Sequence, residues 1–236
     1  MNTIRCQIKQ VTPFNDAVYQ IILKPEIAFD FKAGQYLCVI MGDTDKRPFS
    51  IASAPDSEHI ELHIGAAVSE SYPMQVVKRM QESLQNGTSI EIEAPGGDAH
   101  LRHESGRARL LIAGGSGFSY IKSIIEHQIA LQQKIPTTLY WGCRTQDAMY
   151  YETIARQWHN TYPWMNFVPV IEQASAGWDG KEANLLEQLK SDFISLNGYD
   201  IYIAGRFDMV GTAREVFRTM GVEEDHLYGD AFAFIK

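Results

Sequence analysis

The chain has 236 residues and carries 21 basic against 29 acidic side chains, which gives a net charge of −8. This acidity argues against non-specific binding to nucleic acid or to an anionic membrane, and no apolar run reaches the roughly 18 residues of a membrane span. Cys6, Cys38 and Cys143 are far apart and include no Cys-x-x-Cys pair. They argue against a disulfide framework and exclude a cluster with four cysteine ligands from this chain. We therefore expect a cytoplasmic protein with room for two domains.

The first 95 residues or so show mainly the alternating pattern of half-buried strands. Ile90 and Ile92, for example, alternate with Glu91 and Glu93. Six short strands are predicted, near residues 3–8, 18–23, 36–41, 49–53, 59–65 and 88–94. One helix interrupts them after Ser71, a suitable cap, with Val77, Met80 and Leu84 on one face and a stop at 86–87. This pattern predicts an antiparallel six-stranded β-barrel.

The pattern changes after the polar stretch 102–107. Short apolar runs typical of buried parallel strands now alternate with helical patterns. The strands are expected near residues 110–113, 137–141, 167–170 and 199–204, and the helices near 121–128, 147–159, 182–190 and 209–220. This alternation predicts an α/β domain with a parallel sheet covered by helices on both faces. The two domains are therefore expected at residues 1–103 and 104–236.

A glycine-rich segment lies between the first strand and the first helix of the second half. It consists of Ala113, Gly114, Gly115, Ser116, Gly117 and Phe118. Glycines at such a turn let backbone N–H groups approach a phosphate, and the helix N-terminus favours its charge. The segment departs from the usual dinucleotide fingerprint, because Tyr120 stands where a third small residue is expected. A tight turn without a ligand is the alternative interpretation.

The second strand of this domain ends at Arg144 with no acidic residue. An acid there would bind the ribose hydroxyls of NAD, whereas an arginine can face a ribose phosphate. We therefore expect the protein to accept NADPH as well as NADH. The alternative is that Arg144 is a surface residue paired with Asp147.

A second unusual segment joins a cation, an aromatic ring and a hydroxyl at the start of a predicted strand. It consists of Arg47, Pro48, Phe49 and Ser50. Considered alone, it could be an ordinary edge strand that places its aromatic ring in the core.

Taken in order along the chain, these segments resemble the ferredoxin–NADP reductase superfamily. The segment 47–50 is similar to its Arg-x-Tyr/Phe-Ser flavin motif, and 31–36 to the strand that leads into the flavin site. The segment 113–118 is similar to its phosphate loop, and 202–209 occupies the place of its Cys-Gly-Pro-x-x-Met segment. Stretches at 45–50, 61–66, 203–207 and 229–234 are most similar to the bacterial NAD(P)H:flavin oxidoreductases of the Fre and LuxG type.

The resemblance implies hydride transfer from NADH or NADPH to N5 of a loosely bound flavin (riboflavin, FMN or FAD) that is released reduced. It implies that Ser50 is the catalytic residue, with its hydroxyl near N5. The flavin would be bound by Arg47, Pro48, Phe49, Ser50, His63, Ile64, Gly65 and Ala66. The nucleotide would be bound by Ala113, Gly114, Gly115, Ser116, Gly117, Phe118, Arg144, Gly205, Arg206, Phe207 and Met209. No metal site is implied, and His100 with His103 fits a solvated loop better than a metal site.

Two departures from the superfamily pattern are visible: Ala204 replaces its cysteine and Arg206 its proline. Phe232 and Phe234 lie near the place of its terminal aromatic residue. Reduced flavin could pass by diffusion to an oxygenase or a luciferase. One alternative is an FAD-containing reductase that passes electrons to a separate iron–sulfur or haem protein. The other is a non-catalytic nucleotide-sensing module on the same fold.

Overall fold

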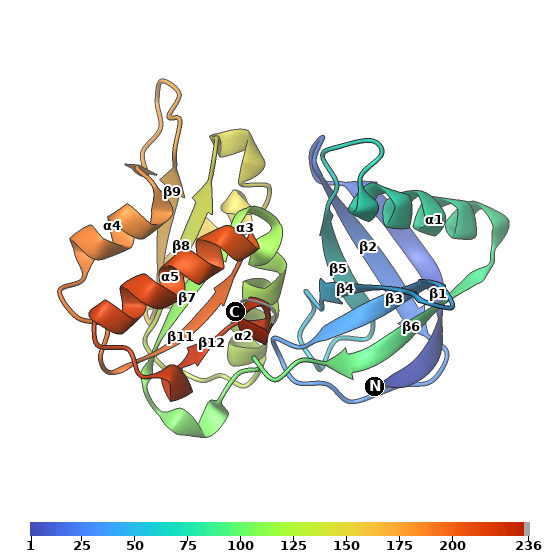
Figure 1. Ribbon diagram of the computed structural model, residues 1–236, viewed down its shortest axis with the longest axis horizontal. Coiled ribbons are helices and arrows are strands. Elements are labelled where there is room, and N and C mark those ends of the chain that lie inside the picture. The colour runs from blue at the N-terminus through green and yellow to red at the C-terminus, as the bar shows by residue number, and fades with distance from the viewer. Residues whose placement is uncertain (234–236) are drawn as a thin grey trace. The chain divides into compact units, whose positions relative to one another are not determined.

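The computed structural model describes residues 1–233, and contacts between them divide the chain into two compact units (Figure 1). The first unit comprises Met1–Leu101 together with Lys122–Gln132, and the second comprises Arg102–Ile121 together with the chain from Gln133 onward. The predicted division between residues 103 and 104 assigns the segment 122–132 to the second domain, whereas the contacts group it with the first unit. The two domain ranges, 1–103 and 104–236, stay a prediction.

The first unit is built on an antiparallel sheet whose strands follow the order β4-β3-β6-β1-β2-β5. The strands are β1 (Asn2–Pro13), β2 (Val18–Pro25), β3 (Tyr36–Gly42), β4 (Asp45–Ser50), β5 (Ile60–Gly65) and β6 (Ser89–Gly96). An antiparallel bridge between Ile51 and Leu62 joins the two outermost strands, so the sheet closes on itself. The alternating side chains fill its interior, as buried Ile4, Cys6 and Ile8 of β1 show. The predicted six-stranded antiparallel barrel is confirmed.

The fourth strand differs from its predicted position. It was expected at 49–53, yet β4 begins at Asp45 and ends at Ser50. The reason is a tight turn after β3, which places Asp45 opposite Gly42 and continues the ladder with Lys46 opposite Ile40. Polar residues therefore enter the strand because its neighbour pairs with their backbone, and Ser50 stands at the end of the strand.

Helix α1 (Tyr72–Asn86) covers part of this barrel. The Ser71 side chain accepts a hydrogen bond from the Met74 backbone N–H at 3.3 Å, as the cap prediction requires. At the other end, Gly87 adopts a left-handed conformation with φ of 64°, which glycine reaches without steric cost. The buried face carries Val76, Val77 and Met80, whereas Leu84, predicted on it, is exposed.

The second unit is built on a parallel sheet whose strands follow the order β10-β9-β8-β7-β11-β12. The strands are β7 (Ala108–Gly114), β8 (Thr137–Cys143), β9 (Met165–Ile171), β10 (Lys181–Glu182), β11 (Tyr199–Ala204) and β12 (Leu227–Tyr228). Its helices are α3 (Glu152–Thr161), α4 (Leu185–Asp192) and α5 (Phe207–Thr219), together with the beginning of α2 (Phe118–Ala130), whose residues from Lys122 onward group with the first unit. The short edge strands β10 and β12 were not predicted, because two residues are too few to show a period.

Helices lie on both faces of this parallel sheet, which confirms the predicted α/β architecture (Figure 1). Apolar residues of α4 and α5 pack with Ile112 and Ile203 on one face. On the other face, Phe118 at the start of α2 stacks on Trp141 of β8, with ring centroids 4.0 Å apart, and lies beside Trp158 of α3. The strand order reverses between β7 and β11, and the loops at the carboxyl ends of such a pair form the usual binding crevice of an open α/β sheet.

Among residues 1–233, no helix combines the length and the apolar character needed to cross a membrane.

Candidate functional site

The Arg47 side chain is buried and fastens β4 to the beginning of α1. Its guanidinium donates to both carboxylate oxygens of Asp45, at 2.8 and 2.5 Å, and to the backbone oxygen of Tyr72 at 2.8 Å. It also donates to Gln75 at 3.1 Å and lies 4.0 Å from the centroid of the Tyr72 ring. The hydrogen bond from Arg47 lowers the pKa of the Asp45 carboxyl. The arginine that was predicted to face a flavin is thus fully engaged by protein groups.

The end of β4 lies beside the end of β5. The Ile51–Leu62 bridge is antiparallel, so Ser50 is level with His63. Ser50 and Phe49 are half-buried and Pro48 is exposed. Within residues 1–233 the Ser50 hydroxyl has no hydrogen-bond partner, so it is available to a ligand.

The predicted flavin segment of β5 presents mainly its backbone. The side chains of His63, Ile64 and Ala66 are buried, and His63 packs edge-on against Phe14 with centroids 4.9 Å apart. Gly65 is half-buried. The structure therefore brings the predicted segments 47–50 and 63–66 together, but buries the side chains of His63, Ile64 and Ala66.

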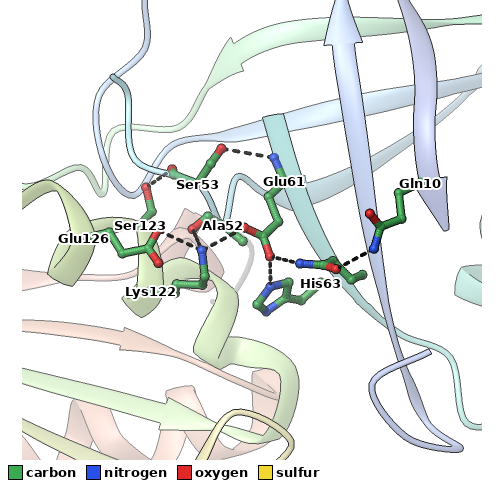
Figure 2. Close-up of polar contacts among 9 residues, drawn as sticks. Gln10, Ala52, Ser53, Glu61, His63, Lys122, Ser123 and Glu126 are labelled. Carbon is green, nitrogen blue, oxygen red and sulfur yellow. Dashed lines mark hydrogen bonds and ion pairs between the residues drawn. The ribbon is translucent and has the colours of Figure 1, made fainter. Parts of the chain in front are cut away.

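A cluster of charged and polar side chains joins β5 to α2 (Figure 2). We call Lys122, Glu61, Glu126 and His63 the Lys122 cluster. The Lys122 Nζ atom donates to Glu61 Oε2 and Glu126 Oε2, both at 2.8 Å, and to the Ala52 backbone oxygen at 3.3 Å. These three acceptors match the three N–H donors of an ammonium group. The Lys122 side chain is only 2% exposed, so its charge is stabilised by these partners rather than by water.

Glu61 is the centre of the cluster. Its Oε1 atom accepts hydrogen bonds from Gln20 at 2.6 Å and is 2.8 Å from His63 Nε2. Burial alone would raise the pKa of the Glu61 carboxyl, but the bond to His63 and the charge of Lys122 lower it to about 2. Burial lowers the pKa of His63, so its ring is neutral and Nε2 donates to Glu61. Burial also raises the pKa of the Glu126 carboxyl, against the opposing charge of Lys122.

Sequence reasoning missed Lys122 and its neighbour Ser123. The available signal was a lysine followed by a serine inside the apolar helical run that includes Ile121, Ile124 and Ile125. A polar pair at such a place indicates buried partners, because an unpaired buried charge is costly. The partners themselves are about 60 to 70 positions away along the chain, as the Lys122 bonds to Glu61 and Ala52 show.

In the second unit, the predicted phosphate loop is packed against the loop that follows β11. A Cβ atom on Gly117 would lie 2.5 Å from the Ala204 backbone oxygen, and one on Gly205 would lie 3.3 Å from the Gly114 Cα atom. A Cβ on Gly114 would also lie 2.8 Å from the Met209 sulfur. The two glycine-containing loops therefore approach more closely than any larger residue permits, at the point where the strand order reverses.

The loop itself is an open cradle of backbone at the beginning of α2. Residues Gly115–Gly117 form a 3₁₀ turn, and Gly115 has φ of 53° with nothing within 4 Å of a Cβ position. The Gly115 backbone oxygen accepts a hydrogen bond from Trp141 Nε1 at 3.0 Å, which anchors the loop to β8. A phosphate fits such a cradle because it needs free space beside glycine backbone near a helix N-terminus.

Several predicted nucleotide residues differ in their surroundings. The Phe118 side chain, predicted to bind a cofactor, is fully buried against Trp141 and supports the loop by packing. Arg206 is exposed and paired with Asp208, with the shorter bond at 2.6 Å, and Phe207 is 61% exposed. Arg144 is exposed, and among residues 1–233 it forms no ion pair with Asp147. Arg144 and Arg206 thus offer two cations beside the carboxyl ends of β8 and β11.

Of the two aromatic residues that lie near the place of the superfamily's terminal aromatic residue, the structure describes Phe232. Phe232 packs against the apolar cluster of the second unit, with the Arg214 guanidinium 5.9 Å from its ring centroid. Phe234 lies outside the described residues.

Comparison with known proteins defines the class of protein. The model of the oxidoreductase NAD-binding domain matches residues 111–215. A solved structure described as the ferredoxin reductase in carbazole 1,9a-dioxygenase matches with a TM-score of 0.81 and 21% identity, over 98% of this chain and 69% of that one. This likeness shows the fold alone, that of the two-domain, ferredoxin reductase-like oxidoreductases.

The sequence relatives are more specific. The chain is 48% identical to an NAD(P)H-flavin reductase of Vibrio harveyi, over 99% of this chain and 100% of the relative. It is also 48% identical to an NAD(P)H-flavin reductase of Aliivibrio fischeri, over 98% and 99% of the two chains. The chain belongs to the family of NAD(P)H-flavin reductases.

Proposed function

We propose that this protein reduces a loosely held flavin with NADH or NADPH and releases the reduced flavin. The observation that carries the proposal is the Ser50 hydroxyl, which has no hydrogen-bond partner within residues 1–233 and stands where β4 ends beside β5. When bound, the nicotinamide supplies a hydride at C4 and the flavin accepts it at N5. The names of the sequence relatives support the same reaction.

In the first unit, the chain orients the flavin ring. Ser50 holds the ring edge at N5 through its hydroxyl, and Pro48 with Phe49 shapes the pocket beside it. The backbone of Ile64 and Gly65 lines the site, because the side chains of His63, Ile64 and Ala66 are buried. Fixed backbone dipoles at such a place stabilise charge that develops on a reduced ring. Arg47 supports the site indirectly, by holding β4 against α1.

In the second unit, the chain holds the nucleotide. The backbone of Gly114–Gly117 binds the phosphates, as the open space beside Gly115 allows. Gly205 and Met209 flank the nicotinamide, while Arg206 and Phe207 form the exposed rim. Arg144 faces the additional ribose phosphate of NADPH, which makes both nucleotides acceptable.

The product is free reduced flavin, and its acceptors are oxygenases or luciferases that use it after diffusion. We place the protein in the cytoplasm, a reducing compartment that suits its three free cysteines. The competing function is an FAD-containing reductase with a protein electron acceptor, which would need a flavin that stays bound.

Steady-state oxidation of NADH and NADPH with riboflavin, FMN and FAD in turn tests the function. We expect turnover of both nucleotides only when flavin is added to desalted protein. Cytochrome reduction that is independent of added flavin, together with a yellow colour that survives dialysis, would establish the competing function. No oxidation with any of the three flavins would leave only a nucleotide-sensing module.

Ser50→Ala tests the residue that carries the proposal. We expect kcat to fall about 10- to 100-fold, because a small misplacement of reacting groups has effects of that order. The melting temperature should stay unchanged, since no bond within residues 1–233 is lost. Ser57→Ala, at an exposed position of the same unit, is the matched control. A wild-type kcat for Ser50→Ala at saturating flavin refutes the role.

A further inference from the structure

Two side chains of α2 bind the backbone that directly follows Ser50 (Figure 2). Lys122 Nζ donates to the Ala52 oxygen at 3.3 Å, and Ser123 Oγ donates to the Ser53 oxygen at 2.7 Å. Both bonds are buried. Helix α2 thus holds the backbone that follows Ser50, and the nearer of the two bonds is only two residues from Ser50.

The same lysine also holds the other strand of the proposed flavin site. It donates to Glu61, whose backbone oxygen accepts the Ala52 N–H at 2.7 Å and whose N–H donates to Ser53 Oγ at 3.1 Å. Glu61 lies two residues before His63 and bonds to its ring. Lys122 is therefore the group that both strand ends share.

The buried charge of Lys122 indicates that this side chain fixes the geometry of its partners rather than simply filling space. A lysine with 2% of its side chain exposed would be expensive without partners, yet Lys122 uses all three donors on two carboxylates and one carbonyl. An apolar side chain could fill the same volume, but it could not fix the Ala52 carbonyl and the Glu61 carboxylate relative to each other. Directional bonds of this kind set geometry as well as stability.

We propose that Lys122 is a positioning residue for flavin reduction, because it holds the segment after Ser50 and the segment before His63 in one geometry. Lys122 does not touch the reacting atoms; it acts through Ser50. The proposal rests on the proposed function of the Ser50 hydroxyl at the flavin ring. Ser123 assists by fixing the next carbonyl.

A double-mutant cycle tests this role with the full-length protein, NADH and FMN. The variants are Lys122→Met, Ser50→Ala and the double variant, with Lys78→Met as control because Lys78 is a half-exposed helix residue whose ion pair is with exposed Glu70. The measured quantity is the single-turnover rate of hydride transfer, identified by its isotope effect with NADH deuterated at C4. Thermal melting and the KM for NADH are recorded for every variant.

We expect Lys122→Met to lower the hydride-transfer rate about tenfold or more in the wild-type background and less than about twofold in the Ser50→Ala background, because residues that act as a unit are not additive. The KM for NADH should stay within about twofold of the wild-type value. A loss of the same factor in both backgrounds, or none in either, overturns the proposal.

Ser123→Ala in the same two backgrounds decides the question if Lys122→Met does not fold. If Ser123→Ala lowers the hydride-transfer rate in the wild-type background but not in the Ser50→Ala background, the positioning role is supported. If Ser123→Ala leaves the rate unchanged in both backgrounds, the positioning role is overturned. A wild-type protein that oxidises no NADH with FMN shows instead that the proposed function has failed. An active wild-type protein with additive variants shows that only the positioning role has failed.

Discussion

The two candidate binding regions are held in place by different physical means. At the ends of β4 and β5, the backbone is positioned by a buried set of charged and polar side chains around Lys122 and Glu61. At the ends of β7 and β11, it is positioned by the absence of side chains, since Gly114, Gly117 and Gly205 permit two loops to touch. The first region depends on electrostatics and hydrogen-bond direction, and the second depends on volume.

This difference has consequences for how each region fails. The stability of a charged cluster depends on pH, because the gain or loss of a single proton changes the balance of buried charge. A close approach of backbone responds to an added methyl group and is indifferent to pH. The following experiments separate the two cases, beginning with the largest expected effect.

Acid should weaken the first region through Glu61. A carboxyl whose folded pKa is about 2 instead of the usual 4.5 adds stability above pH 4.5 and loses it as the pH falls toward 2. The full difference corresponds to about 3 kcal/mol. Glu126 opposes part of this loss, because its raised pKa costs stability at neutral pH and that cost is relieved in acid. Neutral His63 adds to the loss below pH 6.5.

Urea unfolding of the wild type and of Glu61→Gln at several pH values between 6 and 3 measures this effect. We expect the free energy of unfolding of Glu61→Gln to fall less steeply below pH 4.5 than that of the wild type. Glu58→Gln, which changes an exposed carboxyl of the same segment, should keep the wild-type slope. Parallel curves for the wild type and Glu61→Gln would show that the cluster does not respond to acid.

A methyl group should weaken the second region at any pH. Gly117→Ala places a Cβ atom 2.5 Å from the Ala204 backbone oxygen, which cannot move aside as a side chain would. We expect a loss of about 2 kcal/mol of unfolding free energy and a rise of about tenfold in the KM for NADH. Gly115→Ala is the matched control for the free energy of unfolding alone, because its Cβ meets no protein atom and only its φ of 53° costs about 1 kcal/mol. Equal losses in the two variants would refute the role of close approach.

The smallest effect is expected at the exposed rim of the second region. Arg144→Ala should raise the KM for NADPH about three- to fivefold, because an exposed ion pair contributes at most about 1 kcal/mol. The KM for NADH should not change, since NADH lacks the additional phosphate. Steady-state kinetics with both nucleotides measures the ratio, and Lys134→Ala, at another exposed position, serves as control. A change shared by both nucleotides would contradict the assignment.

Much of the fold could be predicted because it is encoded by local periods. The alternation in β6 and the apolar run of β7 each predicted the strand type and its approximate place. β4 was displaced because Lys46 and Arg47 look like loop residues until their pairing with β3 is known. Leu84 was predicted on the same helix face as Val77 and Met80, but unlike them it is exposed.

The candidate sites divide in the same way. The Ser50 segment and the glycine loop were visible because short stretches of the chain carry them. The Lys122 cluster was invisible because its members come from β5 and α2, and only the folded chain unites them. Phe118 was predicted in the nucleotide loop from its place in the sequence, and the structure shows its side chain stacked on Trp141, so its part in binding stays a prediction for the backbone.

Helix α2 begins directly after the phosphate loop, yet its residues from Lys122 onward group with the first unit. Cutting the gene where the sequence changes its period would therefore leave the isolated barrel without Lys122 and Ser123, with Glu61 lacking its cation. Exchange of nucleotide domains between relatives would meet the same obstacle, because a donor domain must bring a helix whose second half matches the recipient barrel. The boundary at which the chain could be divided or recombined thus lies within α2. The barrel and the nucleotide-binding domain must be exchanged together because the barrel needs Lys122.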